Sequence, residues 1–159
     1  MNRPRLFLSA VSSELRTVRQ RVAATVRTLG FDPVSQDDFP TGHGELRQWL
    51  REQIDACEGL IQIVGQGYGA EPREVDADYG RVSYTQLELL YARRQHKKTW
   101  PIIAGEQVQR DAPLEQLDLP AGDADHPVTD VQLDSATLVA WLRARRAPTQ
   151  CHPRRQPAP

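Results

Sequence analysis

The chain has 159 residues, with 20 lysines and arginines against 21 aspartates and glutamates, a formal net charge of −1 and 39% hydrophobic residues. A chain of this length can bury one sizeable core, and its composition is typical of a globular domain rather than a disordered one. The near-zero net charge excludes a general affinity for nucleic acid or membrane surfaces, and only a local patch stays open. No apolar run approaches a membrane span of roughly 20 residues, and no secretory signal precedes the three apolar residues 6–8. The two cysteines, Cys57 and Cys151, indicate neither a disulfide framework nor a zinc site, so we expect a cytoplasmic domain.

A short apolar run predicts a first strand at residues 6–8, and an amphipathic segment follows it almost directly. Apolar residues recur in this segment at spacings of three and four, which is typical of a helix with one buried side. They are Leu15, Val18, Val22, Val26 and Leu29. The opposite side, which we expect to face solvent, carries Arg16, Arg19, Gln20 and Arg27. Ser12 or Ser13 can cap the start of this helix, and Gly30 supplies its stop.

Residues 31–35 predict a second, short strand, which we place at a sheet edge because Pro33 cannot donate to a hydrogen-bond ladder. A turn-rich loop at 37–44 follows, and helical spacing of apolar residues then predicts a helix over 45–57. The most strand-like run of the chain is 59–65, which is apolar on both faces apart from Gln62. We therefore expect it to be a central, parallel strand.

A glycine-rich and acidic loop at 65–82 leads into a predicted helix at 83–94, and residues 99–104 predict a fourth strand. Strands that alternate with helices of this length indicate βαβ crossovers. The predicted fold is α/β, a flavodoxin-like open parallel sheet with helices on both faces, in one domain over residues 1–146.

The end of the chain differs in composition. Residues 105–130 lose the periodicity and carry seven acids against one base, Arg110, so we expect an acidic connection. Asp134 can cap a terminal helix that runs through about Arg146. Residues 147–159 contain four prolines and an arginine pair, the composition of an exposed tail or linker. We therefore expect further domains to be fused to this one in the full-length protein.

Ligands of open parallel sheets bind beyond the carboxyl ends of the strands, where successive crossovers go to opposite faces. This rule selects the loops at 9–13, 37–44 and 65–83. Small residues in the first and third loops allow close backbone approach, and the helix start near Ser12 favours phosphate. The run from Gly65 to Gly69 satisfies neither a dinucleotide fingerprint nor a P-loop, so a flexible turn is the alternative interpretation.

Glu88 is the most informative residue, because its carboxyl group stands within an apolar and aromatic helical stretch. Its neighbours on the helical wheel are aromatic or small, and they are Tyr84, Tyr91, Thr85 and Ala92. Such neighbours desolvate a carboxyl group and raise its pKa, the usual setting of a carboxylate that acts on a ligand. The alternative is a structural ion pair with Arg94 or Lys98.

Other chemical signals are weaker. Residues 76–80 begin like a calcium loop, but Leu87 stands where the closing glutamate should be, so we expect a solvated acidic loop. The four histidines are scattered, and no metal site is predicted. The serines at 9, 12 and 13 lack a nucleophile elbow. The arginines between 143 and 155 favour a solvated tail, with an RNA-binding patch as the alternative.

Six separated motifs, in order, resemble a known family over about residues 5–104. They are Leu6-Phe7-Leu8-Ser9 with Glu14-Leu15-Arg16, Leu29-Gly30-Phe31, Phe39-Pro40, Cys57-Glu58 leading into Ile61-Gln62-Ile63-Val64-Gly65, Tyr68-Gly69, and Ser83-Tyr84-Thr85-Gln86-Leu87-Glu88. This is the TIR-like domain of unknown function found at the N-terminus of many bacterial NACHT, AAA and TPR proteins of the STAND type. The family is similar to Toll/interleukin-1 receptor (TIR) domains and, more distantly, to nucleoside deoxyribosyltransferases. The resemblance implies an effector or assembly module of a bacterial defence receptor.

In enzymatic TIR domains a glutamate on the helix after the third strand assists cleavage of the nicotinamide–ribose bond of NAD+, and Glu88 matches it in position. The resemblance implies NAD+ as substrate, with no bound cofactor, and a nucleotide site around Ser9, Ala10, Phe39, Gly65, Tyr68, Ser83 and Tyr84. The Trp-Cys pair that often precedes this glutamate is replaced here by Thr85-Gln86. Two readings stay open: an NAD+ glycohydrolase activated by self-association, and a non-enzymatic module for homotypic interaction. A deoxyribosyltransferase-like enzyme is the third alternative.

Overall fold

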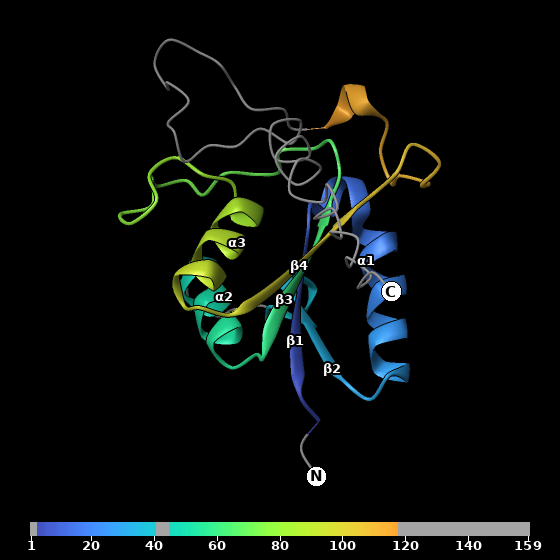
Figure 1. The fold of residues 1–159 in the computed structure, drawn as a ribbon. Coiled ribbons are helices and arrows are strands. Elements are labelled where there is room, and N and C mark those ends of the chain that lie inside the picture. Colours follow the sequence, from blue (N-terminus) through green and yellow to red (C-terminus); the bar gives the residue numbers. More distant parts are fainter. Residues whose placement is uncertain (1–2, 41–44, 118–159) are drawn as a thin grey trace, which may run out of the picture.

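The computed structural model describes residues 3–40 and 45–117 of the chain (Figure 1). Four strands alternate with three α-helices in the predicted order. The strands are β1 (Arg5–Ala10), β2 (Asp32–Ser35), β3 (Gly59–Val64) and β4 (Lys98–Ile103), and the helices are α1 (Ser12–Thr28), α2 (Leu46–Asp55) and α3 (Tyr84–Arg94). Two short 3-10 helices complete the set, η1 (Gln36–Asp38) and η2 (Leu114–Gln116).

All four strands are parallel and form one sheet in the order β2-β1-β3-β4. This confirms the predicted flavodoxin-like open α/β sheet, with β2 at an edge and β3 in an interior position. From β1 the chain passes through α1 to β2 on one side of β1. It then passes through α2 and α3 to β3 and β4 on the other side of β1, so the strand order reverses between β1 and β3. The carboxyl ends of β1 and β3 therefore form the switch point at which such sheets bind ligands.

The two faces of the sheet are covered unequally. Figure 1 shows α1 on one side of the sheet and α2 with α3 on the other. The larger core lies under α2 and α3 around Phe7, Leu50, Leu60 and Leu89. Leu6, Leu8 and Ala10 pack toward α1 instead, because neighbouring residues of a strand point to opposite faces. On β4, Trp100 and Ile102 remain exposed among the described residues.

The first strand and the start of α1 differ from the sequence prediction. The strand continues past residue 8 because its parallel pairing with β3 extends to Ala10 opposite Ile63. Neither Ser12 nor Ser13 caps α1; Val11 is the residue before the helix, and it makes no side-chain cap hydrogen bond. The Ser12 hydroxyl instead accepts a hydrogen bond from Arg19 (3.0 Å). Ser9 therefore belongs to the rigid end of a strand rather than to a loop.

Several expectations fall outside the described residues. These are the second half of the acidic connection (118–130), the terminal helix at 134–146 and the tail at 147–159. Within the described part, the connection after β4 runs against α1, where Asp111 accepts hydrogen bonds from the main-chain N–H of Thr17 (2.8 Å) and from its hydroxyl (2.5 Å).

Among the helices of the described ranges, none combines the length and apolar character needed to span a bilayer.

Candidate functional site

Three polar side chains meet at the switch point, on the face of the sheet that α3 covers. Ser9 of β1 stands opposite Gln62 of β3 in the parallel register. The amide of Gln62 donates to the carbonyl of Thr85 in the first turn of α3 (3.4 Å). Glu88 lies one turn further along the same side of α3. The carboxyl ends of β1 and β3 and the beginning of α3 thus converge on one small polar patch inside the molecule.

Glu88 is only 2% exposed, and burial raises the pKa of its carboxyl group from 4.5 to about 7. The Ser9 hydroxyl and the positive charge of Arg19 act in the opposite direction and favour the charged form. This confirms the expectation that the surroundings of Glu88 desolvate it. The alternative of an ion pair between Glu88 and Arg94 was wrong, since Arg94 contacts Asp78 (3.1 Å) in the described part of the chain.

The patch contains polar atoms that the protein itself leaves unpaired. Within the described residues, the hydroxyl oxygen of Ser9, Oε1 of Gln62 and Oε2 of Glu88 are all buried and lack a hydrogen bond of good geometry. An unpaired buried polar atom costs about 1–3 kcal/mol. Three of them on adjacent elements make this patch a candidate site for a polar ligand.

Arg19 is buried, contrary to the prediction from the sequence pattern. It was expected on the solvent-facing side of its helix, but it is 2% exposed. Its guanidinium donates to the main-chain carbonyl of Ala10 (3.0 Å), to the Ser12 hydroxyl (3.0 Å) and to a carboxylate oxygen of Asp37 (2.8 Å). Side chains of a helix lean toward its N-terminus, so Arg19 reaches back to the end of β1. The only sequence signal was an arginine close to an edge of the apolar stripe.

The glycine-rich loop after β3 already holds an anion, and that anion is Glu14. This glutamate is fully buried, and its carboxylate accepts hydrogen bonds from the main-chain N–H groups of Gln66 (2.9 Å) and Gly67 (2.7 Å). Arg110, from the segment after β4, completes the site at 2.7 Å. These N–H groups are satisfied within the protein, so the loop is neither a free turn nor an open phosphate cradle.

The other residues expected around a nucleotide lie in two groups. Gly65 and Tyr68 are buried in the loop after β3, and burial raises the pKa of the Tyr68 hydroxyl above its usual range. Ser83 is buried and caps α3 by accepting a hydrogen bond from the main-chain N–H of Gln86 (3.3 Å). Tyr68 and Ser83 lie near the start of α3, whereas Gly65 faces Glu14 of α1.

Phe39 and Tyr84 lie on the side of the molecule formed by α2. Phe39 packs edge-on against Trp49, with 5.5 Å between the ring centroids. Tyr84 packs against the core under α2 and α3, in the same cluster as Trp49. Ser9 and Glu88 meet on the face of the sheet that α3 covers, whereas Ala10 packs toward α1.

Residues 76–80, expected as a solvated acidic loop, are held against α2 and α3 by ion pairs. Asp76 is 4% exposed and contacts Arg51 of α2 at 2.8 Å. Its second oxygen accepts hydrogen bonds from the main-chain N–H groups of Asp78 (3.0 Å) and Tyr79 (3.2 Å). The acidic loop expectation was therefore wrong for Asp76, because two arginine-bearing turns of α2 lie directly under it.

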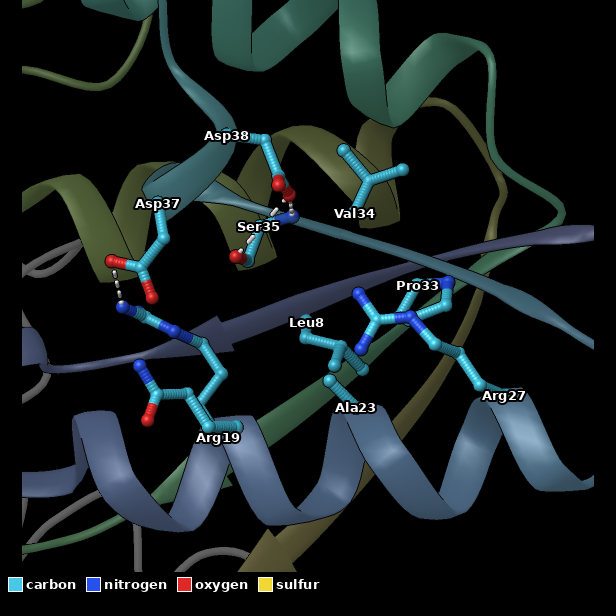
Figure 2. A pocket seen from close by; sticks show the side chains of 10 residues that line it. Leu8, Arg19, Ala23, Arg27, Pro33, Val34, Ser35, Asp37 and Asp38 are labelled. Atoms are coloured by element: carbon cyan, nitrogen blue, oxygen red, sulfur yellow. Dashed lines mark hydrogen bonds and ion pairs between the residues drawn. The ribbon is translucent and has the colours of Figure 1, made fainter.

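A cavity of about 160 Å³ lies between α1 and the β2 edge. Figure 2 shows Arg19 reaching from α1 toward Asp37 at one end of this cavity, with Arg27 at the other. The floor is apolar and includes Leu8, Ala23, Pro33 and Val34. The ion pair between Arg19 and Asp37 (2.8 Å) is part of the lining of this cavity.

The described residues contain no group of three or more histidine, cysteine, aspartate or glutamate side chains that could hold a metal ion. Cys57 is a buried free thiol, and burial raises its pKa to about 11, which makes it a poor nucleophile.

The sequence matches the protein family described as "Domain of unknown function (DUF4062)" over residues 5–135. No curated protein matches the chain.

Proposed function

The chain belongs to the DUF4062 family, and we propose that this member is a TIR-like effector domain that cleaves the nicotinamide–ribose bond of NAD+ when several copies are brought together. The observation that carries the proposal is the buried Glu88 carboxyl group, with a pKa near 7, beside the Ser9 hydroxyl at the switch point of the sheet. In this proposal the domain acts in the bacterial cytoplasm, as the output module of a larger STAND-type receptor.

The chemistry needs little beyond a well-placed carboxylate. Nicotinamide is a good, cationic leaving group, so the ribosyl carbon passes through an oxocarbenium-like transition state. A carboxylate close to that carbon stabilises the developing positive charge, and a desolvated environment makes the stabilisation stronger. In the proposal Glu88 supplies this charge, while the Ser9 hydroxyl and Oε1 of Gln62 bind ribose hydroxyls.

Access to the site must be coupled to a conformational change. Glu88 is 2% exposed, so a ribose can reach it only when the side chains above it move. We assign this movement to the segment between β3 and α3, which is fastened by ion pairs at the surface of α2 and α3. Self-association of several copies would shift the population toward the open arrangement.

The test is nicotinamide release from NAD+ by the purified chain, at high concentration and after tethering into oligomers. We expect Glu88→Gln to lower the rate at least about a hundredfold, because the uncharged amide cannot stabilise the oxocarbenium ion. The wild-type rate should rise as the pH is raised through about 7, since Glu88 acts in its ionised form. Glu52→Gln, which changes an exposed glutamate of α2, is the matched control and should retain the full rate.

Two results would contradict this proposal. One is the absence of nicotinamide release by concentrated, tethered wild-type chain, and the other is an equal rate in folded Glu88→Gln. Either result would favour the second reading, a non-enzymatic module for homotypic assembly. Release of a base from deoxynucleosides in place of NAD+ would identify the deoxyribosyltransferase-like alternative.

A further inference from the structure

Arg19 connects three parts of the molecule that the sheet alone does not hold together. One Nη atom donates to the carbonyl of Ala10 at the end of β1, and the other donates to Ser12 at the start of α1 and to Asp37 after β2. These are the chain segments that border the switch point. A planar guanidinium with fixed donor directions can hold three acceptors in one arrangement, which a lysine ammonium on a flexible stem does less well.

The start of α1 needs such a connection. Leu15 has non-helical backbone angles (φ −129°, ψ 24°), so the first turn of the helix is separated from the rest by a kink. Arg19 stands beyond the kink, and its side chain returns across it to Ser12 and Ala10. The position of the first turn, and of the main chain after Ser9, therefore depends on this side chain.

We propose that Arg19 is the positioning residue of the site, which holds the Ser9–Ala10 end of β1 opposite Glu88 and ties the loops after β1 and β2 into one arrangement. The catalytic importance of Arg19 rests on the proposed function, but the geometry can be tested without measuring the turnover of NAD+. Arg19 touches no reacting atom in this scheme; it acts through Ala10, Ser12 and Asp37.

The charge of Arg19 also reaches Glu88. In the described part of the chain, the groups that act on the Glu88 carboxyl are the Ser9 hydroxyl from β1 and the Arg19 guanidinium from α1, and both favour ionisation. The β3 strand presents only the neutral Gln62 to this stretch of α3. Removal of the Arg19 charge should therefore raise the pKa of the Glu88 carboxyl group.

The first experiment titrates the Glu88 side chain by carbon NMR in the full chain, with Glu88→Gln to assign its signal. We expect Arg19→Gln to raise the midpoint of the Glu88 titration by about half a pH unit to one pH unit. The variant should also shift the amide signals of residues 9–12. Arg16→Gln is the matched control, since Arg16 also approaches Asp37 (3.9 Å) from α1 but its side chain is 59% exposed. It should leave the midpoint and these amide signals unchanged.

The second variant keeps the proposal testable if Arg19→Gln does not fold. Arg19→Lys retains the charge but loses the planar fork, so we expect a midpoint close to wild type together with shifted amide signals at residues 9–12. Wild-type amide signals in Arg19→Lys, or a wild-type midpoint and amide signals in folded Arg19→Gln, would overturn the positioning role. A wild-type chain that releases no nicotinamide would overturn the proposed function and leave this result standing.

Discussion

Gly65, in the loop after β3, lies against Glu14 of α1. A Cβ atom at this position would lie 2.5 Å from the carboxyl carbon of the buried Glu14, closer than non-bonded atoms approach in proteins. Neither side can move freely, because the carboxylate also holds Gln66, Gly67 and Arg110. We expect Gly65→Ala to lower the free energy of unfolding by about 1–3 kcal/mol, measured by urea denaturation.

Gly105→Ala is the matched control for this substitution. A Cβ atom at Gly105 would meet nothing within 4 Å, so the change should leave the unfolding midpoint within error of wild type. Equal midpoints for the two variants would show that the contact between Glu14 and the loop does not constrain the fold. The buried Glu14 carboxylate thus leaves no room for a side chain at position 65.

The segment between β3 and α3 is an element whose position depends on charge. Asp76 is its anchor, because its carboxylate joins Arg51 of α2 to the main chain of Asp78 and Tyr79. Asp76→Asn should weaken both contacts and cost about 1–3 kcal/mol locally. We expect the amide hydrogens of Asp78 and Tyr79 to exchange at least about tenfold faster than in wild type, measured by NMR.

Asp78→Asn is the control for Asp76→Asn in the segment between β3 and α3. The Asp78 side chain is 44% exposed and contacts Arg94 and Arg51 near the surface, where an ion pair contributes little. Its substitution should leave the exchange of the Tyr79 amide nearly unchanged. Unaltered exchange in Asp76→Asn would mean that packing, and not the ion pairs, holds the segment closed.

The stability of the whole molecule should depend on pH through Glu88. Its pKa is raised in the folded state from 4.5 to about 7, so the folded chain retains a proton that the unfolded chain releases in this interval. Stability from this group is present below pH 4.5 and is lost as the pH rises to about 7. The shift corresponds to about 3 kcal/mol of unfolding free energy. Glu88→Gln should recover this free energy at neutral pH because its amide cannot ionise.

The measurement is the difference in unfolding free energy between wild type and Glu88→Gln across this pH interval. A difference cancels the titration of all groups that the two chains share, and Glu52→Gln should run parallel to wild type throughout. A constant difference between wild type and Glu88→Gln would show that Glu88 titrates normally in the folded protein. In the proposed function, Glu88 thus destabilises the fold at the pH at which its carboxylate acts.

The sequence by itself determined the elements, their order and the position of Glu88, because periodicity and apolar runs are local properties of a chain. Parallel β1, β2, β3 and β4, and the burial of Glu88 on the face of α3, were all predictable in this way. The tertiary structure decided which charges are buried. Glu14 and Arg19 are charged residues of an amphipathic segment, and each is buried where partners distant along the chain converge on it, Gly67 and Arg110 on Glu14 and Asp37 on Arg19. Pairing of this kind arises only when the sheet brings the ends of separate strands together, so no pattern in the sequence could show it.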